Sequence, residues 1–217
     1  MNNKPFDDIV SALLSMKRAI FNMITPSLRA VTVKLDMEKE IYTCRFFYDG
    51  FIDEKLFDLA SCTATEASDC WFCDADYIRL DFPAPIPVNG VLAYLRKEPG
   101  ISPPEIRLVS RDSRTIAKIY LSYAMQQGLL GRVVVSLRAV TVNVDEEKKT
   151  MHFYFYYDVL VTKELFILSK EAIDIAKKAF PGTFAVTEEI IFFPFPKRIP
   201  SVVGAPVYRR YEPNHDD

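Results

Sequence analysis

The sequence predicts an α+β protein built from two tandem units, each with the element order α-β-β-α-β-β. The first observation is the segment S-L-R-A-V-T-V, which begins at Ser27 and recurs letter for letter from Ser136. The second is a run of later matches in the same order, ending with Y-x-R-x-E-P at Tyr94 and again at Tyr208. The third is that helical and strand periodicities alternate in the same order in both halves. An internal duplication accounts for all three.

The duplication sets the expected domain boundaries. We expect residues 1–99 to form the first unit and residues 113–217 the second, because a unit of this size can bury a core of its own. Residues 100–112 are expected to be a proline-rich linker, since proline and glycine there interrupt both helices and strand ladders. The two units should pack with pseudo-twofold symmetry, as most self-associating proteins do. The alternative is two separate beads on a string.

Each unit is expected to open with one helix and to carry a second in its middle. Apolar residues recur at three- and four-residue steps from Phe6 to Met23 and from Ile116 to Ala124, as one buried helix face requires. The same spacing returns from Leu56 to Trp71 and from Leu165 to Phe180.

A β-hairpin is expected between the two helices. Val31, Val33 and Leu35 alternate with polar residues, as in a half-buried strand, and a turn follows at Asp36. The return strand places these side chains on one face: Tyr42, Cys44, Phe46 and Tyr48. Two short strands finish the unit, separated by proline pairs that cannot sit inside a central strand.

Composition narrows the class of protein. Hydrophobic residues make up 49% of the 217-residue chain and aromatic residues 13%, which excludes a disordered protein. A formal net charge of −2 argues against a nucleic-acid partner. The first residues lack the basic start of a signal peptide, and the apolar runs are too short to span a bilayer. We therefore expect a cytoplasmic protein with neither nucleic-acid nor membrane partners.

Two repeated arginines are predicted to be buried. Arg29 and Arg138 share the strand parity of the apolar residues that follow them, and a buried charge requires a partner. We expect structural ion pairs within each unit, and the candidate carboxylates are Glu98 and Glu212, or Asp49 and Asp158. The functional alternative is that these arginines bind an anion or a carboxylate ligand.

The cysteine and histidine residues give little evidence of a catalytic or metal-binding site. Cys62, Cys70 and Cys73 cluster in the first unit, and C-x-x-C invites a zinc or redox interpretation, but the second unit lacks all three. We expect reduced thiols, with a cysteine-centred metal or redox protein as an alternative. The chain has two histidines and no glycine-rich phosphate loop, so no catalytic residue, metal or cofactor is expected, and we expect no enzyme.

Acidic residues mark the first unit. Nine acidic residues and two basic ones lie between Asp49 and Asp81, whereas the matching stretch of the second unit holds six and four. We expect the second helix of the first unit to face a basic partner through Glu54, Asp58, Glu66 and Asp69. The alternative is a solvated helix face without a partner.

Aromatic residues mark the other face of the hairpin. Phe47, Tyr154 and Tyr156 point away from the expected core side, and residues of these types are enriched at protein interfaces. They are candidate partner-binding residues. The alternative is that a helix or the other unit covers this face.

The closing motifs carry a resemblance. I-R-L-D-F-P from Ile78, Y-L-R-K-E from Tyr94 and L-R-A-V from Leu28, with the acidic helix between them, resemble small bacterial immunity proteins of the polymorphic-toxin and contact-dependent-inhibition type. The resemblance covers each half separately, and the second half lacks the acidic character. It implies a non-enzymatic protein that binds a toxin and blocks its active site. The acidic helix makes a basic toxin domain the expected partner. The runner-up is a structural or regulatory interaction protein.

Overall fold

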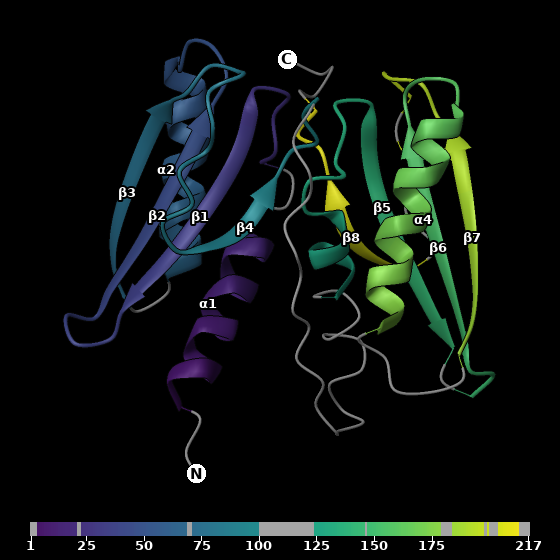
Figure 1. The fold of residues 1–217 in the computed structure, drawn as a ribbon, viewed down its shortest axis with the longest axis horizontal. Helices are drawn as coiled ribbons and strands as arrows, with labels where there is room; N and C mark the ends of the chain where they lie inside the picture. The colour runs from purple at the N-terminus through teal and green to yellow at the C-terminus, as the bar shows by residue number, and fades with distance from the viewer. Residues whose placement is uncertain are drawn as a thin grey trace. The chain divides into compact units, whose positions relative to one another are not determined.

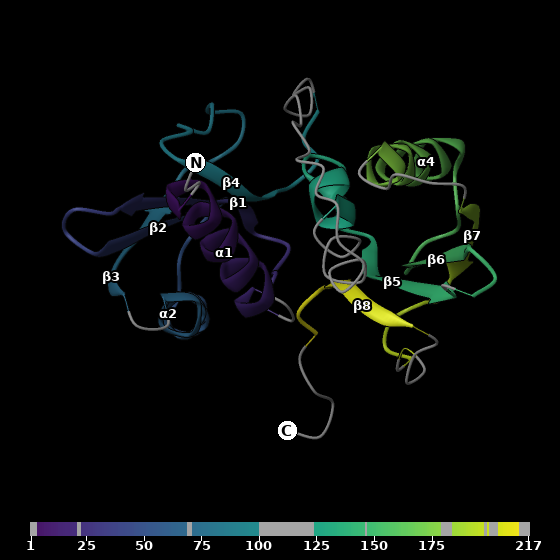
Figure 2. The same cartoon turned by 90° about the horizontal axis from the view of Figure 1, so that it is seen from below.

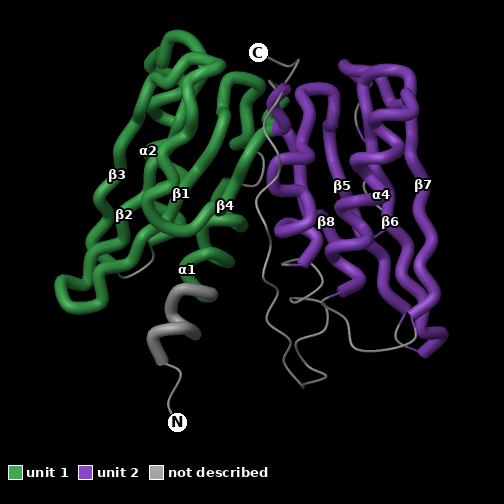
Figure 3. Tube along the Cα trace, viewed as in Figure 1, with its two compact units in different colours: residues 1–96, 211–217 green, residues 97–210 purple. Residues whose placement is uncertain are grey.

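The computed structural model describes residues 4–20, 23–68, 71–99, 124–145, 147–178, 184–197, 199 and 204–212. The chain forms two compact units, coloured separately in Figure 3. Unit 1 contains residues 1–96 together with residues 211–217, and unit 2 contains residues 97–210. The expected linker, residues 100–112, lies outside the described residues. How the two units pack against each other stays a prediction.

Unit 1 has the predicted order α-β-β-α-β-β (Figure 1). Its elements are α1 (Lys4–Ala19), β1 (Leu28–Asp36), β2 (Ile41–Tyr48), α2 (Glu54–Ser68), β3 (Phe72–Arg79) and β4 (Val91–Leu95). The sheet has the strand order β3-β2-β1-β4. Strands β2 and β3 are parallel because α2 connects them as a crossover, and the other two pairings are antiparallel.

Unit 2 repeats this layout. Helical residues 124–129 precede β5 (Leu137–Asp145), β6 (Thr150–Tyr157), α4 (Lys163–Lys178), β7 (Ala185–Phe192) and β8 (Ala205–Arg209). The sheet order is β7-β6-β5-β8. The registers match as well, since Val31 pairs with Phe46 in unit 1 and Val140 pairs with Phe155 in unit 2. The predicted α+β class and repeated layout are confirmed.

The chain that follows the last strand of each repeat belongs to the other unit. Tyr211, after the second repeat's last strand, is part of unit 1, and Lys97, after the first repeat's last strand, is part of unit 2. The amide of Tyr211 donates to the carbonyl of Ile24 at 2.8 Å, which completes unit 1. The amide of Lys97 donates to the carbonyl of Val133 at 2.7 Å in unit 2. Each unit is therefore assembled from chain contributed by both repeats.

The helices cover one face of the unit 1 sheet, and the β3–β4 loop covers the other (Figure 2). The hydroxyl of Tyr42 on β2 donates to the carbonyl of Ala12 on α1 at 3.1 Å, so alternate residues of β2 face the helices. In unit 2 the hydroxyl of Tyr157 on β6 lies 3.0 Å from that of Ser169 on α4. Among the described helices, none is long and apolar enough to cross a membrane.

The repeated arginines lie in β-bulges. The pairing of β1 with β2 shifts between Leu28 and Ala30, and that of β5 with β6 shifts between Leu137 and Ala139. A bulge re-aims the side chain of its extra residue. Arg29 therefore reaches the loop side of the sheet, opposite to Val31, and Arg138 is placed in the same way.

Both guanidinium groups are fully buried and hold the loop by its carbonyls. Arg29 donates through Nη1 to Leu80 O at 2.6 Å and through Nη2 to Ala84 O at 2.9 Å. Its guanidinium carbon lies 5.8 Å from the ring centroid of Phe82, within the range of a cation–π contact. Arg138 repeats the arrangement with the carbonyls of Phe193 and Lys197.

The hairpin-end aspartates contact a different arginine. Arg96 donates to Asp49 at 3.1 Å in unit 1, and Arg210 lies 2.8 Å from Asp158 in unit 2. The amide of Phe82 and the Arg96 guanidinium hold the pKa of the Asp49 carboxyl below its usual value. Pairing of Arg29 with Glu98 and of Arg138 with Glu212 stays a prediction; Glu98 itself is buried.

Replacing Arg29 with alanine should destabilise the protein by about 3–5 kcal/mol, because buried groups that contact the guanidinium lose their partner. Urea unfolding measures the change. The control is Arg45→Ala, which removes a partly exposed ion pair with Asp76 and should cost less than about 1 kcal/mol. An unchanged urea midpoint for Arg29→Ala would show that the buried guanidinium does not stabilise the fold.

Burial of Lys17 should make the stability of unit 1 depend on pH. Its side chain is buried on α1, and burial lowers its pKa to about 7. The unfolded chain keeps this proton up to a pKa of about 10.4, so between these values the unfolded state binds more protons and stability rises with pH. Lys17→Gln, which installs the residue of the matching position Gln126, should flatten the rise. Urea unfolding of both proteins from pH 6 to pH 9 tests this; parallel curves would contradict it.

Candidate functional site

Helix α2 presents its acidic residues in one row. The helix begins after Asp53, whose Oδ1 accepts the amide proton of Leu56 at 2.8 Å and caps the first turn. Small residues on the opposite side are buried: Ala60, Thr63, Ala64, Ala67 and Ser68. Exposed residues recur at four-residue steps, which places them on one ridge of the helix: Glu54, Asp58, Cys62 and Glu66.

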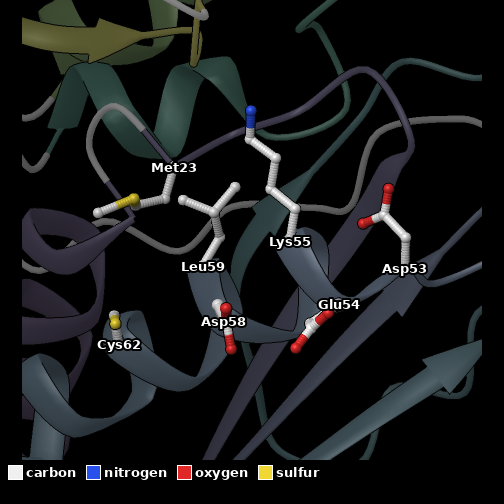
Figure 4. A pocket seen from close by; sticks show the side chains of 7 residues that line it. All are labelled: Met23, Asp53, Glu54, Lys55, Asp58, Leu59 and Cys62. Atoms are coloured by element: carbon white, nitrogen blue, oxygen red, sulfur yellow. The ribbon is translucent and has the colours of Figure 1, made fainter. Parts of the chain in front are cut away.

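An open groove of about 560 Å³ lies along the start of this row (Figure 4). Met23, from the loop after α1, and Leu59 supply apolar surface. The acidic lining consists of Asp53, Glu54 and Asp58. Lys55 extends away from the carboxylates of Glu54 and Asp58 (Figure 4). The ammonium of Lys55 lies 5.3 Å from the ring centroid of Tyr211. The groove thus combines an apolar surface with three carboxylates.

Unit 2 lacks this acidic row. Its helix α4 has the equivalent cap, with Thr162 Oγ1 accepting the amide proton of Leu165 at 3.3 Å. At the positions of Glu54, Asp58 and Glu66, 109 residues further along the chain, stand Lys163, Ile167 and Ile175. Of these two helices, only α2 therefore carries carboxylates at these positions.

The structure brings two of the four predicted acidic residues together. Glu54 and Asp58 both line the groove, Glu66 is exposed further along the same helix, and Asp69 lies outside the described residues. Sequence reasoning missed the groove itself. Asp53 could have been found as the helix cap from its position before the apolar run. The placement of Met23 has no sequence signal, because it depends on how the loop after α1 packs.

The aromatic prediction needs a correction. Phe47 and Tyr156 are buried, so neither side chain is available to a partner. In unit 2 the cover is a loop rather than a helix or the other unit: Tyr156 packs with Ile199, and Phe193 joins them. Tyr154 is half-buried beside this cluster, with its ring centroid 4.2 Å from that of His152.

The cysteines form no recognisable centre within the described residues. Cys44 is buried with its sulfur 3.9 Å from that of Cys73, and burial raises the pKa of the Cys44 thiol. Cys62 is exposed on α2, and Cys70 lies outside the described residues. Among the residues that the structure describes, no three His, Cys, Asp or Glu side chains are grouped to hold a metal ion.

Comparison with known proteins gives the family. No curated protein matches the chain. The model of the family described as MafI2 immunity protein matches twice in succession, over residues 10–98 and residues 118–212. These two segments correspond to the two repeats and together span most of the sequence. The chain therefore belongs to the MafI2 immunity protein family, with one family match in each repeat.

Proposed function

We propose that this protein neutralises a toxin by binding it through the groove and acidic row of α2 in unit 1. Membership of an immunity-protein family supports a toxin as the partner. The observation that carries the choice of surface is the groove, which is lined by the apolar side chains of Met23 and Leu59, by the carboxylates of Asp53, Glu54 and Asp58, and by Lys55. A charged rim around an apolar centre is the usual composition of a protein interface.

Binding alone would account for neutralisation. Immunity proteins are generally non-enzymatic, and such a protein acts by covering the toxin's active site. The acidic row favours a toxin domain with a basic surface, because opposite charges steer the two proteins into contact. We place this action in the cytoplasm, where free thiols such as those of Cys44 and Cys73 stay reduced.

Charge reversal on α2 tests the proposed surface. Asp58→Lys combined with Glu66→Lys should slow association with the toxin by about tenfold or more, because both side chains are exposed and supply the attraction. The probe is the purified product of a toxin-like reading frame adjacent to the protein's own, and rates are measured by surface plasmon resonance. Co-expression should show the matching loss of protection.

The matched control reverses two exposed charges in unit 2, Lys177→Glu with Lys178→Glu, and should leave the association rate nearly unchanged. Circular dichroism should show that both double variants are folded. Equal loss in both variants, or no loss in either, would refute the proposed surface.

Salt dependence gives a separate prediction. Raising the ionic strength from about 10 mM to about 150 mM shortens the Debye length from about 30 Å to about 8 Å. Association of the unaltered protein should therefore slow with added salt, while that of the Asp58→Lys, Glu66→Lys variant should not. A salt-independent rate for the unaltered protein would rule out long-range attraction.

A further inference from the structure

In unit 2 an arginine side chain stands at the position that corresponds to Met23 in the groove of unit 1. At the position of Met23 stands Arg132, and at the position of Cys62 stands Glu171, each 109 residues further along the chain. Arg132 Nε donates to Glu171 Oε2 at 3.0 Å. The two residues that flank the groove in unit 1 are therefore replaced in unit 2 by an internal arginine–carboxylate pair.

The guanidinium of Arg132 is well held. Its side chain is 11% exposed, and Nη1 also lies 3.2 Å from the carbonyl oxygens of Gly128 and Leu130, at the end of the preceding helical segment. Carbonyls at a helix C-terminus attract cations, because the helix dipole is negative there. In unit 2 the carboxylate of Glu171 on α4 and the C-terminal carbonyls of the preceding helical segment thus form a binding site for a guanidinium.

Unit 1 keeps the helix end at this place but has neither the arginine nor the carboxylate of the unit 2 pair. The residue that corresponds to Gly128 is Ala19, the last residue of α1. Cys62 carries no charge in place of Glu171, but Asp58 and Glu54 lie one and two turns earlier on the same ridge. Where unit 2 has Arg132, unit 1 has the apolar side chain of Met23 beside an open groove.

We propose that the groove of unit 1 receives an arginine side chain from the toxin, next to the place that Arg132 fills in unit 2. The guanidinium lies against Asp58, one turn from the position that corresponds to Glu171, and its aliphatic stem covers Met23 and Leu59. This inference rests on the proposed function and names the chemistry that the surface recognises. Arginine fits better than lysine, because its planar fork binds carboxylates in pairs and its stem packs on apolar surface.

The same comparison places the proposed arginine site in unit 1 and not at the corresponding position of unit 2. In unit 2 the equivalent site is occupied by the chain's own arginine, and α4 carries Lys163 and Ile167 in place of Glu54 and Asp58. In unit 2 the corresponding site is therefore already occupied by Arg132, and the carboxylates of Glu54 and Asp58 have no equivalent there.

The decisive variant transplants the internal pair into unit 1: Met23→Arg with Cys62→Glu. One positive and one negative charge are added, so the net charge and the long-range attraction stay the same. The new arginine should occupy the groove and raise the dissociation constant for the toxin by about 100-fold, since a centrally placed arginine is a typical hot spot. Unaltered affinity would overturn the inference.

Two controls keep the result interpretable. Val159→Glu with Leu160→Arg adds the same two charges at exposed positions of unit 2 and should bind the toxin within about threefold of the unaltered protein, as expected for changes outside the contact surface. Urea unfolding should show that the transplanted variant is folded. If Asp58→Lys with Glu66→Lys weakens binding and the transplant does not, the arginine site is wrong while the proposed function stands. If neither change weakens binding, both are wrong.

A small-molecule probe tests the proposed arginine site of unit 1 without the toxin. N-acetylarginine methylamide should shift the amide resonances of Asp58, Leu59 and Cys62 in the full chain, and its neutral citrulline analogue should not. The transplanted variant should lose the arginine response. Equal shifts from both compounds, or none from either, would contradict a site that selects a guanidinium.

Discussion

Burial of one guanidinium in each sheet is the constraint on which the rest of each unit depends. A charge without water must be surrounded by oxygen atoms, and Arg29 and Arg138 each take two of theirs from backbone carbonyls of the loop after the third strand of their unit. The loop must therefore lie across the sheet. There it brings Phe82 or Phe195 to within about 6 Å of the guanidinium. The repeated F-P sequence and the repeated arginine are thus two parts of one interaction.

With one sheet face sealed by the loop and the other by the helices, the outer ridge of the middle helix is the surface that can change without cost to the core. The two repeats diverge at this ridge. Unit 1 carries Glu54 and Asp58 there, unit 2 carries Lys163 and Ile167, and the strands beneath keep the same register. Shared packing and divergent helix exteriors are what duplication followed by specialisation would produce in a binding protein.

The sequence predicted much of the fold because its repeat and its periodicities are local signals. Alternation along β2 was enough to group Tyr42, Cys44 and Phe46 on one face, and all three are buried. Arg29 is buried but lies on the opposite face from Val31, since a β-bulge changes parity without any mark in the sequence. The partner-binding role predicted for Phe47 was wrong, because that side chain is buried. The acidic ridge was visible from composition and helical spacing, but the groove required Met23, whose position depends on tertiary packing.

The exchange of chain ends has a genetic consequence. The amide of Tyr211, which follows the last strand of the second repeat, donates to the carbonyl of Ile24 in unit 1, and unit 2 begins at Lys97, before the second repeat. A stop codon late in the second repeat therefore removes part of the first unit. Point substitutions such as those at Arg132 and Glu171 can accumulate in the second copy, but its deletion damages the copy that remains. A chain joined in this way can therefore change more readily by substitution in one repeat than by the loss of a whole repeat.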